Sequence, residues 1–281
     1  WLAQKHGVDM ASLNVFNDFC SGMFPKYRKM MMHLIPSVGG FGNLNSALNV
    51  KNILVLGATG MIGSRIVTEA MTRGHTVVRA GRKAPETSVA FIHSVEVNAS
   101  DAASLRAALT ETKAPWGMAM GFDVVVVALG PSRDPAAKAP PLVDTYKAIV
   151  EVCSSLGGQG ADAEKSQKSA GPRVVFAGGA GSLVVPGGAG SGLAVDQPWF
   201  PEALKNEALQ HSEALEYLKG QSALAEWTYL SPPAMIQPGE RTGKYRVDKD
   251  TMVMPGEGPA TISAEDYAIA LLDEIDEPKN A

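Results

Sequence analysis

Three glycines at three-residue spacing form the segment of this chain with the clearest chemical meaning. Gly57, Gly60 and Gly63 follow the apolar run 52–56 and precede an amphipathic stretch. A strand-to-helix turn built from glycines lets a phosphate approach the backbone N–H groups at the helix N-terminus. The spacing is G-x-x-G-x-x-G, and its position between strand and helix favours a dinucleotide site over a loop kept for packing. The residues expected at the pyrophosphate are Gly57, Ala58, Thr59, Gly60, Met61, Ile62 and Gly63.

Basic residues follow the second expected strand, where the adenosine ribose of a dinucleotide would lie. An acidic residue there favours NAD, whereas a basic residue favours the 2′-phosphate of NADP. The run 75–83 holds Arg82, with Arg79 and Lys83 nearby, and no carboxylate. We therefore expect a preference for NADP(H), with NAD(H) binding or solvated loop charges as the alternatives. By their positions after the next strands, Asn98 and Ala99 would meet the adenine, and Ala128, Leu129 and Gly130 would line the ribose side.

Alternating apolar and amphipathic stretches from Lys51 onward predict the elements that position these residues. Such alternation is typical of parallel βαβ units. The fold class is therefore α/β, with a Rossmann-like doubly wound parallel sheet and a small C-terminal region that covers the substrate. Expected strands cover 52–56, 75–80, 95–97, 122–129, 173–177 and 227–230, and expected helices cover 61–73, 101–109, 142–156, 201–218 and 264–275.

Residues 1–50 differ from the rest of the chain in charge. They carry four basic and two acidic side chains, whereas residues 51–281 carry 21 basic and 27 acidic ones. Apolar residues at helical spacing between Leu13 and Met23 predict a helix. We expect an N-terminal helical extension and linker over 1–50, and an NAD(P)-binding domain with its C-terminal substrate region over 51–281. The extension either packs on that domain or binds a partner protein or a membrane surface.

The composition excludes several classes of function. A net charge of −4 argues against nucleic-acid binding. The two cysteines lie far apart, and the five histidines lack metal-ligand spacing, so nothing supports a metal site. Glycine and proline interrupt both long uncharged stretches, so we expect no transmembrane segment and a soluble intracellular protein, in the cytoplasm or an organelle interior. Because the chain begins at Trp1, a removed targeting peptide stays open.

Five segments together resemble the atypical short-chain dehydrogenase/reductase superfamily, in its NAD(P)H-binding branch of NmrA-like proteins and flavin/biliverdin-IXβ reductases. The segments are 57–63, 178–183, 227–233, 238–245 and 262–268. The resemblance runs from about Lys51 to the C-terminus and leaves residues 1–50 outside. It implies NAD(P)H binding, with Arg82 at the 2′-phosphate and with Pro232, Pro233 and Ala234 beside the nicotinamide. The flavin/biliverdin reductases have a His where this chain has Ala234, which weakens transfer of their substrate specificity.

The Tyr-x-x-x-Lys pair that serves as acid and base in ordinary short-chain dehydrogenases is missing from its expected helix. Helix 201–218 has Lys205, but its only tyrosine is Tyr217, which is followed four residues later by a glutamine. The single match, Tyr245 and Lys249, lies in a segment with strand character. An extended chain would separate the two Cα atoms by about 13 Å, against about 6 Å for one helical turn. We therefore interpret this match as coincidental.

Two residues remain as candidates for the chemistry. The Ser182 hydroxyl could hold a substrate carbonyl near the nicotinamide, or it could satisfy the backbone of its glycine-rich loop. Lys205 could supply a positive charge nearby. The sequence thus supports two functions. One is an NADP(H)-dependent reductase that transfers a hydride to a small-molecule acceptor. The other is a non-catalytic NAD(P)H-binding redox sensor or accessory subunit, which would bind a partner protein through residues 1–50.

Overall fold

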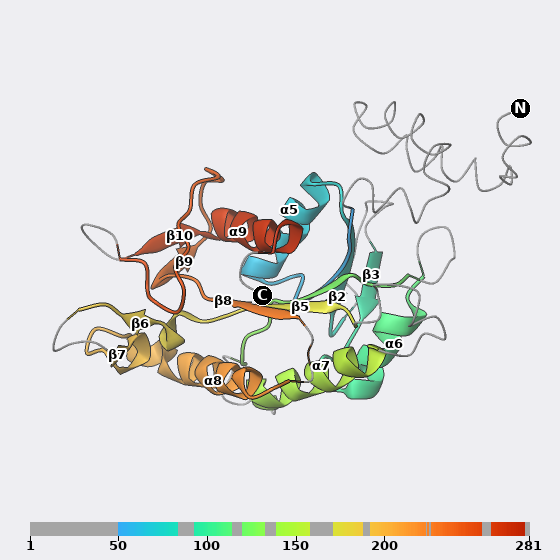
Figure 1. The fold of residues 1–281 in the computed structure, drawn as a ribbon, viewed down its shortest axis with the longest axis horizontal. Coiled ribbons are helices and arrows are strands. Elements are labelled where there is room, and N and C mark those ends of the chain that lie inside the picture. Colours follow the sequence, from blue (N-terminus) through green and yellow to red (C-terminus); the bar gives the residue numbers. More distant parts are fainter. Residues whose placement is uncertain are drawn as a thin grey trace, which may run out of the picture.

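The computed structural model describes most of the chain from residue 50 onward as a sheet between two layers of helices (Figure 1). The described residues are 50–83, 93–113, 120–132, 139–157, 171–187, 192–222, 224, 226–254 and 260–278. The expected N-terminal helix lies outside them. The domain boundary at residue 50 therefore stays a prediction.

The central sheet has six parallel strands in the order β3-β2-β1-β4-β5-β8. This order confirms the predicted doubly wound α/β fold. The direction of winding reverses between β1 and β4, and ligands of such folds bind at the carboxyl ends of the strands beside that point. The strands are β1 (Asn52–Leu56), β2 (Thr76–Gly81), β3 (His93–Glu96), β4 (Val124–Val127), β5 (Arg173–Ala177) and β8 (Trp227–Leu230).

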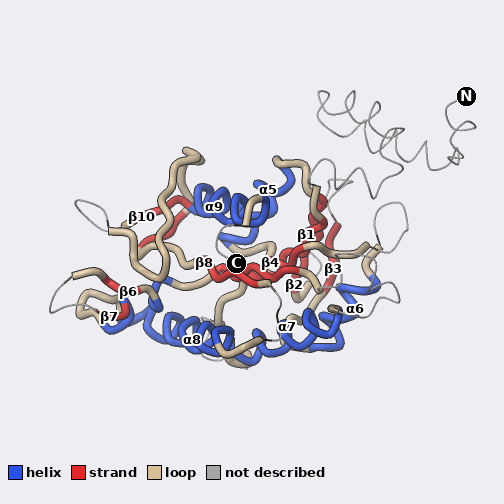
Figure 2. Tube along the Cα trace, in the orientation of Figure 1, coloured by secondary structure: helices blue, strands red, loops and turns tan. Residues whose placement is uncertain are grey.

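In the described residues, helices α5 to α9 cover the two faces of the sheet, as Figures 1 and 2 show. On one face lie α5 (Met61–Thr72) and α9 (Ala264–Asp276), and on the other lie α6 (Ala102–Glu111), α7 (Leu142–Leu156) and α8 (Glu202–Lys219). Strand β1 serves both cores, because Ile53 and Val55 pack toward the first layer while Leu54 and Leu56 pack toward the second. A strand buried on both faces reads as a continuous apolar run, which explains the 52–56 pattern.

Short elements follow the carboxyl ends of β5 and β8. After β5 come a 3₁₀ turn (Ala180–Ser182), the antiparallel pair β6 (Val184–Val185) and β7 (Gly192–Leu193), and a second 3₁₀ turn (Ala194–Asp196). After β8, the parallel pair β9 (Met235–Gln237) and β10 (Thr261–Ser263) leads into α9. Whether these elements cover a substrate stays a prediction. In the described part of the chain, every helix is too short or too polar to span a bilayer.

Candidate functional site

The turn after β1 has a backbone that only glycine fits. Gly57 has φ +79°, and its N–H donates to the carbonyl of Ala80 at 3.1 Å. A Cβ at this position would stand 2.2 Å from the carbonyl oxygen of Ala128. Both the left-handed backbone and the close approach of the chain after β4 therefore require glycine.

The first turn of α5 leaves backbone donors available to an anion. A Cβ on Gly63 would stand 2.2 Å from the Gly57 carbonyl oxygen, so the helix packs directly on the loop. Gly60 is the N-cap residue and supplies no side-chain cap, and the first turn holds no carboxylate. The first helical hydrogen bond runs from Ser64 to Gly60, so the N–H groups of residues 61–63 have no partner within the helix. This donor set fits a pyrophosphate.

The other predicted cofactor residues follow neighbouring strands along the same edge of the sheet. Asn98 comes after β3, Arg82 after β2, Gly57 after β1 and Ala128 after β4, which is the order of the strands in the sheet. An extended dinucleotide bound along this edge would meet them in turn. The structure brings Ala128 against Gly57, whereas Asn98 accepts hydrogen bonds from its own loop, including one from the Ser100 hydroxyl at 2.8 Å.

The basic residues after β2 differ in their surroundings. Arg82 and Lys83 are exposed, whereas Arg79 is half-buried and its Nε donates to the Ser94 hydroxyl at 3.4 Å. The two exposed cations are therefore better placed to reach a ribose phosphate than Arg79. The assignment of Arg82 stays a prediction.

Ser182 and Lys205 both make contacts within the protein. The Ser182 hydroxyl donates to the Gly179 carbonyl at 3.3 Å. The Lys205 ammonium pairs with Glu202 at 2.7 Å and is 41% exposed. Lys205 and His211 are six residues apart on α8, which rotates them by about 120° from one another. Lys205 therefore points away from the helix face that carries His211, and the chemical roles of both predicted residues stay predictions.

A polar cluster at the carboxyl ends of β5 and β8 is the part of the site that sequence reasoning missed. It consists of Glu207, His211, Tyr229 and the N–H of Gly179. His211 is buried, and its Nδ1 lies 3.3 Å from the Tyr229 hydroxyl. The same hydroxyl accepts from the Gly179 N–H at 3.3 Å and lies 3.2 Å from the His211 carbonyl, to which it can donate. Tyr229 thereby ties α8 to the loop after β5.

Two side chains of this cluster converge on the loop after β4. The Nε2 atom of His211 and the Oε1 atom of Glu207 lie 3.9 and 3.8 Å from the point where a Cβ on Gly130 would stand. Burial lowers the pKa of His211, although Glu207 opposes the shift. Burial also raises the pKa of Tyr229. The sequence did hold a signal, since Glu207 and His211 are four residues apart on the helix that follows the fifth strand.

The residues expected beside the nicotinamide follow β8. Pro232 is buried, and Pro233 and Ala234 are partly buried. Ala234 packs against an apolar cluster of Val185, Ala194 and Met252. A His in place of Ala234 would have to displace that contact or turn out of it. The assignment of the three residues to the nicotinamide stays a prediction.

The segment with Tyr245 and Lys249 forms no helix, as expected for a coincidental match, although it joins no strand either. The Tyr245 hydroxyl donates to the Asp273 carboxylate, and burial followed by that hydrogen bond raises its pKa to about 12. Tyr245 and Lys249 line a cavity of about 420 Å³ beside α9. Across the described ranges, no three His, Cys, Asp or Glu side chains gather closely enough to hold a metal ion.

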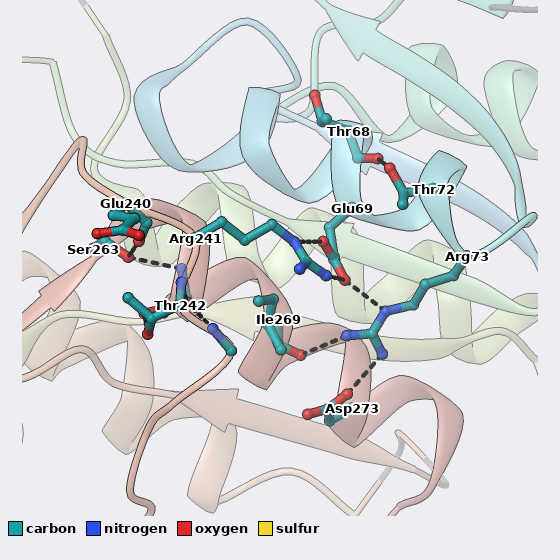
Figure 3. Close-up of polar contacts among 12 residues, drawn as sticks. Thr68, Glu69, Thr72, Arg73, Glu240, Arg241, Thr242, Ser263, Ile269 and Asp273 are labelled. Atoms are coloured by element: carbon teal, nitrogen blue, oxygen red, sulfur yellow. Dashed lines mark hydrogen bonds and ion pairs between the residues drawn. The ribbon is translucent and has the colours of Figure 1, made fainter.

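Residues 238–245, which we call the strap, fasten the region after β9 to both helices of one layer. Arg241 donates to both carboxylate oxygens of the buried Glu69 on α5, each at 2.9 Å, and Arg73 donates to the same carboxylate at 2.9 Å (Figure 3). Arg73 also pairs with Asp273 on α9 at 2.7 Å. Burial alone would raise the pKa of Glu69, but hydrogen bonds from the two arginines hold it below its usual value.

Two adjacent carboxylates at the start of α9 hold the rest of the strap. Glu265 accepts from the Gly239 N–H at 2.8 Å and from Arg65 at 2.9 Å, while Asp266 accepts from the N–H groups of Thr242 and Gly243, each at 2.8 Å. These contacts occupy both carboxylates, so the pair positions the chain rather than serving as an acid and a base.

Comparison with known proteins also relates this chain to NAD(P)H-binding proteins. Residues 57–278 match the protein family described as NAD(P)H-binding. The Bacillus subtilis protein YwnB, itself uncharacterised, is 32% identical over 234 residues, which cover 80% of this chain and 92% of YwnB.

Two solved structures share the fold. One, a "putative exported protein" from Burkholderia pseudomallei, is 38% identical with a TM-score of 0.64, covering 82% of this chain and 95% of that one. The other, a "putative NADH-flavin reductase" from Streptococcus pneumoniae, is 27% identical with a TM-score of 0.61, covering 82% and 95%.

Proposed function

The chain belongs to the NAD(P)H-binding family, and we propose that within it the protein is an NADP(H)-dependent reductase that passes a hydride to a small acceptor. The observation that carries the proposal is the glycine turn at Gly57, whose geometry excludes any side chain and leaves the donors of residues 61–63 open. A bound dihydronicotinamide supplies the hydride. The protein's own residues orient the dinucleotide along the carboxyl edge of the sheet.

The preference for NADP(H) rests on the residues after β2. Arg82 is exposed at the position where a 2′-phosphate would lie, Lys83 is exposed beside it, and the end of the strand carries no carboxylate. A guanidinium binds phosphate through charge-assisted hydrogen bonds, whereas the 2′-hydroxyl of NAD(H) would leave it unpaired. Asn98, Ala99, Ala128, Leu129 and Gly130 complete the proposed adenosine and ribose contacts.

The proposed acceptor lies between the loop after β5 and the Pro232–Ala234 segment. Ser182 holds its carbonyl oxygen, after turning its hydroxyl from the Gly179 carbonyl. Lys205 would have to leave its ion pair with Glu202 to bring positive charge to the acceptor. The name of the Streptococcus pneumoniae relative points to a flavin as one acceptor to assay. Substituting Ser182→Ala is expected to slow turnover, and turnover unaffected by this change would remove Ser182 from the mechanism.

The first experiment is calorimetric titration of the purified protein with NADPH and, in parallel, with NADH. We expect one tight site that prefers NADPH, followed by NADPH oxidation when menadione or FMN is added. If neither nucleotide binds, the glycine turn serves packing alone and the reductase proposal fails. If both bind equally, the NADP(H) preference fails while the cofactor site stands.

A second candidate is a non-catalytic redox sensor or accessory subunit. The observation in its favour is helix α8, which holds the position of the usual acid/base pair and lacks it. This candidate predicts nucleotide binding without turnover on any acceptor. It also predicts that deletion of residues 1–50 abolishes binding of a partner protein and leaves nucleotide affinity unchanged.

A further inference from the structure

His211 occupies the place in the site where an acid is needed. It lies on α8, the helix that carries the acid in ordinary short-chain dehydrogenases, and its side chain reaches the loops after β4 and β5. One ring nitrogen is engaged, because Nδ1 lies 3.3 Å from the Tyr229 hydroxyl. The other, Nε2, has no hydrogen-bond partner among the described residues and faces Gly130. The ring is thus held at one nitrogen and open at the other.

We propose that His211, held by Tyr229 and set beside Glu207, donates the proton that completes reduction of a carbonyl-type acceptor in this site. The inference rests on the proposed reductase function. In the step, the acceptor carbonyl takes the hydride at its carbon, and its π electrons move to the oxygen. That oxygen forms an O–H bond with the proton from Nε2, and the N–H electron pair stays on the imidazole. For a ketone or aldehyde the products are the alcohol, the oxidised nicotinamide and a neutral His211. For a quinone such as menadione, the hydride arrives at one carbonyl oxygen, the electron pairs shift through the ring to the other carbonyl oxygen, and that oxygen takes the proton from Nε2, so the product is the hydroquinone.

The surroundings suit a group that releases its proton easily. Burial disfavours the charged ring and lowers the pKa of His211, while the Glu207 carboxylate raises it. Other titratable groups lie on the elements packed against α8. Burial keeps the phenols of Tyr229 on β8 and Tyr146 on α7 neutral and raises the pKa of the Cys153 thiol on α7 to about 12. The charged side chains on these elements, Asp144, Lys147, Glu151 and Asp196, are exposed. Glu207 is therefore the charged group that opposes the effect of burial on the pKa of His211.

The proposal gives His211 a pH signature. Because the protonated ring is the donor, kcat/KM should fall as the pH rises through the pKa of His211 in the free enzyme. Substituting Glu207→Gln removes the charge that raises this pKa. The fall in kcat/KM should then move to lower pH.

The test compares the wild type, H211Q and H93Q, with menadione as acceptor and NADPH as reductant. For H211Q we expect kcat/KM to fall by about 100-fold, as for loss of a general acid, with NADP⁺ affinity within about twofold of the wild type. H211N keeps an amide near the Nδ1 position and replaces H211Q if that variant does not fold. H93Q is the control, because His93 lies at the amino end of β3 and its Nε2 makes no hydrogen bond within the described residues.

A second readout does not depend on turnover. The pKa of His211 is measured by NMR titration of its ring protons in the wild type and in E207Q. We expect the two NMR values to match the two pH–rate midpoints and to shift together. A purely structural role for His211 would leave the pH profile unrelated to its titration.

Two results overturn the inference while leaving the reductase proposal intact. One is a wild-type enzyme that turns over menadione and an H211Q variant within about threefold of it. The other is a pH–rate profile whose midpoint differs from the measured pKa of His211. A wild-type protein that binds neither nucleotide, or that binds NADPH and reduces no acceptor, overturns the proposed function and this inference with it.

Discussion

The glycine turn after β1 and the polar cluster lie on the same edge of one sheet and are built in opposite ways. The turn is made of backbone, from residues within one short stretch of chain, and it works because side chains are missing from Gly57 and Gly63. The cluster is made of side chains from α8 and β8 that meet the loops after β4 and β5. In our proposal, cofactor binding therefore depends on local sequence, while the chemistry depends on how distant elements pack.

The largest expected effect follows from breaking the turn. Gly57 and Gly74 both have positive φ, of 79° and 89°, but a Cβ on Gly74 would meet nothing within 4 Å. Substituting Gly74→Ala should cost about 1 kcal/mol of backbone strain. Substituting Gly57→Ala should cost about 2–4 kcal/mol, because a clash with the Ala128 carbonyl is added, and NADPH binding should be lost. Urea denaturation measures the stability of both variants, and calorimetry measures their NADPH binding. Equal losses of stability in the two variants would mean that the loop after β1 relaxes and removes the clash.

A smaller effect tests the charge beside the turn. Substituting Arg82→Glu should weaken NADPH binding by about 1–3 kcal/mol more than NADH binding, as for the loss of a charge-assisted contact. Lys83→Glu makes the same change of charge at the adjacent exposed position. If both variants lose NADPH affinity equally, the preference for NADPH over NADH comes from the summed positive charge after β2 rather than from a direct contact with Arg82.

Removing one hydroxyl tests the cluster. Tyr229→Phe deletes the oxygen that accepts from Gly179 and meets His211, and should cost about 1 kcal/mol of stability. Tyr217→Phe is the matched control, because its hydroxyl makes no hydrogen bond with the described residues. We expect NADPH affinity to be unchanged in both, as measured by calorimetry. A loss of NADPH affinity in Tyr229→Phe would mean that the cluster and the turn are coupled.

Mild acid should give the smallest effect. Burial holds the pKa of His211 below its usual 6.5, so the unfolded chain takes up a proton there first and stability falls as the pH drops below about 6.5. His93 contributes with the same sign. The carboxylates that bind the strap, Glu69, Glu265 and Asp266, all have lowered pKa values, so the stability they add is lost only at a pH below this window. Denaturation of H211Q and H93Q between pH 7 and 5 separates the contributions of the two histidines. If the free energy of unfolding of H211Q fell with decreasing pH as steeply as that of the wild type, the lowered pKa of His211 would be contradicted.

Local pattern was sufficient for the scaffold. The expected bounds of β1, α7, β5 and β8 match the structure residue for residue. These elements are long or continuous apolar segments whose burial is set by their own sequence. β4 was expected to be longer than the observed Val124–Val127, because apolar residues continue past the point where ladder hydrogen bonds stop.

The sequence by itself determined the α/β fold and the glycine turn after β1, since an apolar run, three spaced glycines and an amphipathic stretch predict a strand, a turn and a helix. Only the tertiary structure decided which side chains share the site. It set Glu207 and His211 against Gly130, and it assigned the carboxylates Glu265 and Asp266 to the strap. The physical reason is distance along the chain: contacts between residues on different elements follow from how those elements pack, which no local spacing encodes.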